Sequence, residues 1–249
     1  MSKAFEGKVV LVTGANSGIG ESAAVAYQAA GAKVFGLARR TAAVEAARRK
    51  YPQIHWLLAD VAKESDVNAA VDALLKEAGR LDVLVNNAGI GTFTPLADST
   101  ADVVRAQFEV NVYGPTFVTR AALPALKASK GSVINVGSAA GHKTMPNGAH
   151  YAATKAALES LTKSWAMELA PFGIRVNLIA PGPTDTAVFG KLGVPAEAID
   201  AVKAQFVKMV PLGRIASPEE IARWILQLTD PSVTWVTGQI LSIDGGMSL

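Results

Sequence analysis

Residues 8–20 read KVVLVTGANSGIG, and this stretch decides the fold. Lys8 to Thr13 forms a short apolar run, which is typical of a strand buried on both faces. A glycine-rich turn follows at once, and Glu21 to Ala30 is an alanine-rich helical stretch that Gly31 closes. A buried strand, a tight turn and a helix in this order predict an α/β protein with a parallel sheet.

The turn is also typical of a dinucleotide site. Its glycines let the backbone approach a pyrophosphate, and the following helix N-terminus offers N–H groups and positive potential. The spacing is G-x-x-x-G-x-G rather than G-x-G-x-x-G, so a purely structural turn is the alternative. Its place between a strand and a helix favours nucleotide binding, and the predicted contacts are Gly14, Ser17, Gly18, Ile19 and Gly20.

The second predicted strand, Ala32 to Ala38, indicates which dinucleotide is bound. An NAD-binding unit places an acidic residue ~20 positions after its turn, where the carboxylate accepts from the ribose hydroxyls. This chain has no acid there, because Ala38 is followed by Arg39 and Arg40. Arginines suit a 2′-phosphate, which favours NADP(H) over the still possible NAD(H). The alternative is that both arginines are simply solvated at a strand end.

Strand and helix patterns keep alternating, which predicts helices on both faces of the sheet. Further strands are expected at 54–58, 81–85, 132–136, 174–179 and 238–244, and helices at 63–78, 100–126, after 147 and at 218–228. Ligands of such sheets bind beyond the carboxyl ends of the strands. The residues expected at those ends are Gly14, Ala38, Asp60, Asn86, Ser138 and Pro181.

Tyr151 and Lys155 carry the predicted chemistry. On a helix they lie one turn apart on one face. A phenol has a pKa near ~10, and a neighbouring ammonium lowers that pKa toward the range useful at neutral pH. Ser138 follows a strand-like run, so its hydroxyl is placed to hold a substrate oxygen beside the phenol. The alternative is a surface tyrosine and lysine on an ordinary helix.

Composition excludes several other classes of protein. The chain has 249 residues, 50% hydrophobic and 18% charged, and no cysteine, so we expect one globular domain without disulfides or Cys–zinc sites. The net charge of +3 is mild, and no basic residues interleave with aromatic ones as on a nucleic-acid surface. No apolar run reaches the ~18 residues of a membrane span, and the N-terminus lacks a signal-peptide core. A cytoplasmic location is expected.

Taken in order, the motifs resemble the short-chain dehydrogenase/reductase family, including its 3-oxoacyl-[acyl-carrier-protein] reductases, over essentially the whole chain. The matching residues are Thr13-Gly-Ala-Asn-Ser-Gly-Ile-Gly20, Asp60, Asn86-Asn-Ala-Gly89, Asn111, Ser138, Tyr151-Ala-Ala-Thr-Lys155, Asn177, Pro181-Gly182 and Asp244-Gly-Gly246. The resemblance implies a single Rossmann-like catalytic domain over residues 1–249. It also implies a doubly wound parallel sheet of about seven strands and a nicotinamide cofactor.

The resemblance further implies an Asn-Ser-Tyr-Lys catalytic set at Asn111, Ser138, Tyr151 and Lys155. Tyr151 would exchange a proton with the substrate, Lys155 would also hold the nicotinamide ribose, and Asn111 would hold a water. From the residues alone, Asn111 could equally be a polar residue that bends a helix. The remaining implied cofactor contacts are Tyr151, Asp60, Val61, Asn87, Ala88, Gly89, Pro181, Gly182, Thr184 and Thr186.

A mixed, mostly apolar set is expected to line the substrate pocket: Ala139, Ala140, His142, Met145, Asn147, His150 and Phe189. The two histidines lack a third ligand at suitable spacing, so no metal site is predicted. The segment 183–211 is rich in Gly and Pro and is expected to form a mobile lid.

The expected function is an NADP(H)-dependent carbonyl reductase or alcohol dehydrogenase that interconverts a ketone and a secondary alcohol, with a small molecule as its partner. The alternatives are an NAD-linked alcohol or sugar-alcohol dehydrogenase, and a catalytically idle sensor or scaffold on the same fold. The apolar stretch 100–126 and the C-terminal residues 245–249 are expected to lie at the interfaces of a homotetramer.

Overall fold

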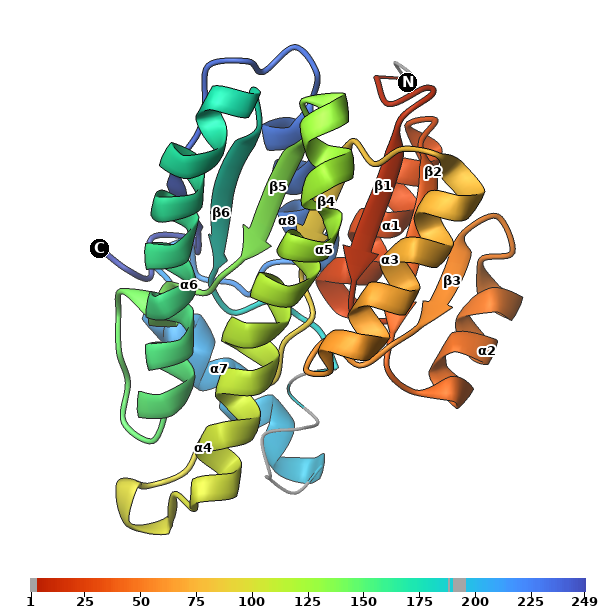
Figure 1. The fold of residues 1–249 in the computed structure, drawn as a ribbon. Helices are drawn as coiled ribbons and strands as arrows, with labels where there is room; N and C mark the ends of the chain where they lie inside the picture. The colour runs from red at the N-terminus through yellow and green to blue at the C-terminus, as the bar shows by residue number, and fades with distance from the viewer. Residues whose placement is uncertain (1–3, 188, 190–195) are drawn as a thin grey trace.

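The computed structural model describes residues 4–187, 189 and 196–249, which contain a parallel sheet of seven strands (Figure 1). The strand order is β3-β2-β1-β4-β5-β6-β7, and every neighbouring pair is parallel. The predicted seven-stranded, doubly wound fold is therefore confirmed. The strands are β1 (Val9–Thr13), β2 (Lys33–Ala38), β3 (His55–Leu58), β4 (Val83–Asn86), β5 (Ser132–Val136), β6 (Arg175–Pro181) and β7 (Ile240–Ile243).

Helices cover both faces of the sheet (Figure 1). One layer holds α1 (Gly18–Ala29), α2 (Thr41–Lys50) and α8 (Pro218–Thr229), and the other holds α3 (Glu64–Ala78), α5 (Gly114–Ser129) and α6 (Ala149–Leu169). Two further helices, α4 (Ala101–Phe108) and α7 (Ile199–Met209), lie toward the carboxyl ends of the strands. No helix in the described part of the chain is long and apolar enough to cross a membrane.

The burial of β1 explains its continuous apolar sequence. All five residues of the strand are buried. Val10 and Val12 pack into the core beneath α1 and α8, whereas Val9 and Leu11 pack into the core on the opposite face. Because successive side chains of a strand point to opposite faces, a strand covered on both sides must be apolar throughout.

The long helix expected at 100–126 is interrupted. A π-helical segment, Glu109–Tyr113, separates α4 from α5. Pro115 has no N–H to donate to the carbonyl of Asn111 four residues earlier, so the regular α-helical ladder fails there. The Gly114 N–H instead donates to the Glu109 carbonyl, five residues back. Sequence periodicity missed this break, which places Asn111 at an irregular point of the helix.

Candidate active site

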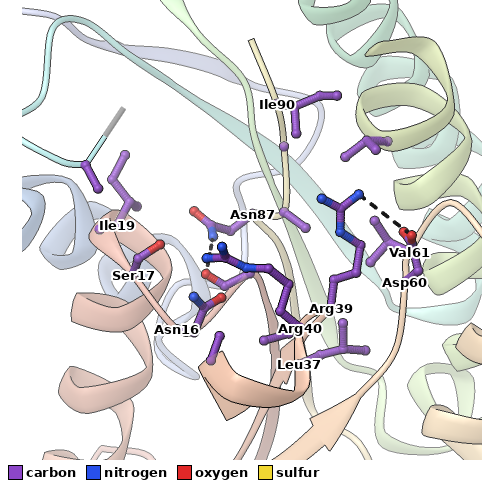
Figure 2. Close-up of a pocket in the computed structure, with 18 of the residues that line it drawn as sticks. Asn16, Ser17, Ile19, Leu37, Arg39, Arg40, Asp60, Val61, Asn87 and Ile90 are labelled. Atoms are coloured by element: carbon purple, nitrogen blue, oxygen red, sulfur yellow. Dashed lines mark hydrogen bonds and ion pairs between the residues drawn. The ribbon is translucent and has the colours of Figure 1, made fainter. Parts of the chain in front are cut away.

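The turns that follow β1 to β4 enclose a cavity of about 580 Å³ at the carboxyl edge of the sheet (Figure 2). The convergence expected from the strand ends is therefore present on this side. Most of the predicted cofactor contacts line it: Gly14, Ser17, Gly18, Ile19, Arg39, Arg40, Asp60, Val61, Asn87, Ala88, Gly89 and Thr186. A cavity of this size beside a helix N-terminus suits a dinucleotide.

The glycines of the turn have a packing reason to be glycine. A Cβ on Gly20 would lie 2.3 Å from Asn87 Nδ2 and 2.5 Å from the Gly14 carbonyl oxygen. A Cβ on Gly14, whose φ is +65°, would lie 2.9 Å from Ala88 Cα. The turn is therefore pressed against the chain that leaves β4. These glycines therefore have a structural role whether or not a cofactor binds. The cavity beside the turn is what favours a ligand as well.

Thr13 holds the two turns together, a role that the sequence pattern alone did not reveal. Its Oγ1 accepts hydrogen bonds from the backbone N–H groups of Asn87 and Ala88, both at 3.0 Å. In return, Asn87 Nδ2 donates to the Thr13 carbonyl at 2.9 Å. These hydrogen bonds join the turn after β1 to the turn after β4 and fix the floor of the cavity.

At the end of β2, Figure 2 shows Arg39 turned toward Asp60. Arg39 Nη1 lies 3.8 Å from Asp60 Oδ2, which is a loose ion pair, and 59% of the Arg39 side chain is exposed. Such an exposed pair contributes little to stability, so Arg39 is free to turn toward another anion. Ala38 is buried and brings no carboxylate to the cavity.

A second cavity, of about 250 Å³, adjoins the first and contains Ser138, Tyr151 and Lys155. The predicted cofactor residues Pro181, Gly182 and Thr184 also line it. Ser138 begins a short 3₁₀ turn after β5, and its Oγ accepts from the Ala140 N–H at 3.2 Å. Tyr151 and Lys155 both lie on α6, as the four-residue spacing predicted.

The electrostatics of Tyr151 and Lys155 differ from the expectation. Burial raises the pKa of the Tyr151 phenol, and a hydrogen bond with the Ser138 side chain only partly offsets this. Burial lowers the pKa of Lys155 to about 8. Lys155 Nζ donates to the Val136 carbonyl at 2.9 Å and lies 5.7 Å from the Tyr151 ring centre. The ammonium is thus hydrogen-bonded to β5, and the phenol pKa is raised rather than lowered as the spacing suggested.

Asn111 is buried and fastens two parts of the site to each other. Its Oδ1 accepts from the Ile90 N–H at 2.9 Å, and its Nδ2 donates to the Ile90 carbonyl at 2.8 Å and to Thr154 Oγ1 at 3.0 Å. Thr154 Oγ1 in turn donates to the Tyr151 carbonyl at 2.7 Å. The side chain therefore ties the segment after β4 to the helix that carries Tyr151.

The predicted pocket residues divide into two groups. Ala139, Ala140, Met145 and Phe189 line the second cavity. Three further apolar residues line the cavity and were not anticipated, because they come from separate parts of the chain with no local signal: Phe93 after β4, Phe206 on α7 and Met247 after β7. His142, Asn147 and His150 are absent from the lining formed by the described residues.

Each of those three residues has a different environment. His142 lies between Glu159 Oε1, 2.9 Å from its Nδ1, and Ser242 Oγ, 3.1 Å from its Nε2. Asn147 has φ of +63°, and its carbonyl accepts from the Thr94 N–H at 2.8 Å. His150 Nε2 is buried without a hydrogen-bond partner in the structure. Within the described ranges, no three His, Asp or Glu side chains are grouped as metal ligands.

The predicted lid is described only in part, because positions 188 and 190–195 lie outside the described residues. Its remaining part contains α7, and Phe206 of that helix meets Phe189 with ring centres 5.9 Å apart. Both rings face the second cavity.

Comparisons with known proteins agree with this geometry. The family model described as enoyl-(acyl carrier protein) reductase matches residues 14–248. The chain is 36% identical over 248 residues to a 3-oxoacyl-[acyl-carrier-protein] reductase of Thermotoga maritima, with 98% of each chain covered. It is 38% identical over 248 residues to a cyclopentanol dehydrogenase of Comamonas testosteroni, with 96% of each covered. The crystal structure of a Brucella melitensis 3-ketoacyl-(acyl-carrier-protein) reductase complexed with NADH superposes with a TM-score of 0.90 at 35% identity, covering 98% of this chain and 99% of that one.

Proposed function

The chain belongs to the short-chain dehydrogenase/reductase family of oxidoreductases that act on alcohols and carbonyls, and from that premise we propose an NADP(H)-dependent enzyme interconverting a ketone and a secondary alcohol. One observation carries the proposal. Ser138, Tyr151 and Lys155 share a cavity that opens beside the site suited to a dinucleotide. A catalytically idle scaffold would not need this convergence of polar groups in an otherwise apolar pocket.

Tyr151 is the proposed acid and base. When bound, the nicotinamide cofactor supplies or accepts the hydride. In the direction of reduction, the Tyr151 hydroxyl donates its proton to the carbonyl oxygen of the substrate. The raised pKa of Tyr151 keeps the phenol protonated at neutral pH, which is the form that this step needs. Ser138 donates a hydrogen bond to the same oxygen and fixes its position.

Lys155 and Asn111 support this step in different ways. Because burial lowers the pKa of Lys155 to about 8, its ammonium gives up a proton more readily near neutral pH than an ordinary lysine does. Lys155 is therefore suited to pass a proton on. Its Nζ is also 3.6 Å from where a Cβ on Gly89 would sit, at the border of the two cavities. The Asn111 side chain already makes hydrogen bonds to the Ile90 backbone and to Thr154 Oγ1, so its proposed role is to position α6.

The end of β2 supports the preference for NADP(H). Arg39 and Arg40 line the first cavity, and no carboxylate occupies the place of Ala38. Asp60 competes for Arg39 at 3.8 Å, so we expect the preference over NAD(H) to be modest. A homotetramer is also proposed, since Tyr113, at the end of the π-helical segment, exposes half of its surface and would be covered by a second copy.

The proposed function is tested by following absorbance of the reduced nicotinamide with a panel of ketones and alcohols. Each substrate is offered with NADPH or NADH, or with their oxidised forms. We expect turnover of at least one ketone, with a higher kcat/KM for NADPH. Binding of either cofactor without turnover of any substrate would favour the idle scaffold. A clear preference for NADH would overturn the role given to Arg39.

A further inference from the structure

The C-terminal tail, Asp244–Leu249, folds back onto the catalytic turn. Lys143 lies directly after the 3₁₀ turn that starts at Ser138, and its backbone N–H donates to the Ala139 carbonyl at 2.8 Å. The Lys143 ammonium donates to the carbonyl oxygens of Met247 and Leu249. One side chain therefore fastens the last residues of the chain to the turn that holds Ser138.

Two further sets of contacts fix the tail. The Asp244 carboxylate accepts from the N–H groups of Gly246 and Ser248, at 3.0 and 2.9 Å. These bonds and the Ser248 side chain hold the pKa of Asp244 below its ordinary value in spite of partial burial. The Leu212 N–H donates to the Gly245 carbonyl at 3.1 Å, which joins the tail to the segment after α7. The tail is thus braced internally by Asp244 and held to two other segments, by Lys143 and by Leu212.

This arrangement places Met247 in the wall of the second cavity. Met247 is only 4% exposed, and it lines the cavity together with Met145, Phe189 and Phe206. Among the described lining residues, Lys155 is the sole charged side chain, and the uncharged polar ones are Asn87, Ser138, Tyr151, Thr184 and Thr186. The wall facing the substrate is therefore apolar and offers no partner for a second charge.

We propose that Met247 is a specificity-determining residue that favours compact, uncharged, apolar ketones, and that Lys143 is the positioning residue that holds Met247 in the pocket wall. The inference rests on the proposed function, since it concerns substrates of the same site. Removing the Met247 side chain enlarges the pocket where the apolar part of a ketone lies. Loss of the Lys143 donors frees the tail and enlarges the same space indirectly.

The kinetic experiment compares wild type, Met247→Ala and Met167→Ala on a series of cyclic ketones of rising ring size with NADPH. Met167 is 74% exposed on α6 and serves as the matched control. We expect Met247→Ala to raise kcat/KM for the largest ketone relative to the smallest by about 10-fold, because a few methylenes discriminate by that order. The Kd for NADPH should stay within about twofold, and Met167→Ala should leave the ranking unchanged.

The positioning role is tested with Lys143→Gln and the conservative Lys143→Arg. Lys143→Gln should shift the ketone ranking in the same direction as Met247→Ala, and Lys143→Arg should restore the wild-type ranking. A second readout needs no activity: peroxide oxidation of Met247, followed by mass spectrometry against Met167 in the same sample. Buried Met247 should oxidise slowly in wild type and faster in Lys143→Gln.

The failures are distinguishable. An active wild type whose ketone ranking is unchanged in Met247→Ala overturns the specificity role and leaves the proposed function intact. Met247 oxidation equal in wild type and Lys143→Gln overturns the positioning role of Lys143. A wild type that turns over no ketone overturns the proposed function, and the specificity role falls with it.

Discussion

The two halves of the cleft are built in different ways. At the ends of β1 and β4, backbone meets backbone so closely that a Cβ on Gly20 would lie 2.5 Å from the Gly14 carbonyl oxygen. Around the second cavity, much of the wall is formed by apolar side chains from separate parts of the chain, among them Phe93 after β4, Phe206 on α7 and Met247 after β7. The first half tolerates few residue types at each position, whereas the second accepts many side chains of similar size.

This difference predicts which substitutions affect the cofactor and which affect the substrate. A half that approaches a constant cofactor through its backbone needs the same glycines whatever the substrate is. A half that surrounds the substrate changes with the substrate. Substitutions in the first half should therefore change cofactor affinity, and substitutions in the second should change turnover and substrate ranking.

Lys155→Met should have a large effect on both turnover and cofactor binding, because Lys155 borders both halves. We expect kcat to fall by at least about 10²-fold, since a group that supports proton transfer is lost. The Kd for NADPH should rise by about 10-fold with the loss of one charged hydrogen bond. Initial rates and equilibrium titration of the cofactor give the two values. Lys163→Met, which alters an exposed lysine on the same helix, is the control. If Lys155→Met changed only kcat or only the Kd for NADPH, Lys155 would serve one half alone.

The contrast between the halves also explains how far the sequence could be interpreted. The strand, turn and helix from Lys8 to Gly31 follow local rules, so the fold and most of the residues that line the first cavity were predictable. The substrate wall was not, because Phe93 and Met247 are far apart in the sequence and come to line one cavity only in the folded chain.

Two local features also escaped the sequence pattern. The apolar periodicity continues through residues 109–113 and gives no sign of the π-helical segment there. Only the missing N–H of Pro115 indicates that the helix is interrupted near Asn111. The four-residue spacing of Tyr151 and Lys155 correctly predicted that both lie on one helix. The hydrogen bond from the Lys155 ammonium to the Val136 carbonyl was not predictable, because it depends on β5 lying beside α6.

The pH dependence should differ between the two directions of the reaction. An ordinary phenol has a pKa near ~10, and burial raises the pKa of Tyr151 further, so the phenol stays protonated between pH 6 and pH 8. Titration of Tyr151 should therefore not change the rate of ketone reduction in this range. Alcohol oxidation needs the phenolate and should rise with pH, by up to about 10-fold per unit. Full pH profiles of kcat in both directions check this. Alcohol oxidation that is faster at low pH than at high pH would contradict it.

Arg39→Ala should have a smaller effect, confined to the cofactor half. A hydrogen bond to a charged group contributes ~1.5 to 3 kcal/mol, and the exposure of Arg39 favours the lower end, which corresponds to about 10-fold in KM for NADPH. The KM for NADH should barely change, because NADH carries no 2′-phosphate for Arg39 to bind. Steady-state kinetics with both cofactors on one ketone separate the two. Arg49→Ala, an exposed arginine on α2 outside the cavity, should match wild type.

Tyr151→Phe tests the central assignment most directly when turnover and cofactor binding are measured on the same preparation. The substitution removes the hydroxyl and keeps the ring, which packs against Phe93 with ring centres 5.4 Å apart. We expect kcat to fall by ~10² to 10⁴-fold while the Kd for NADPH stays within about twofold. Tyr51→Phe, which removes a phenol that lines neither cavity, should retain wild-type values. Turnover of Tyr151→Phe within a few-fold of wild type would show that the proton comes from another group.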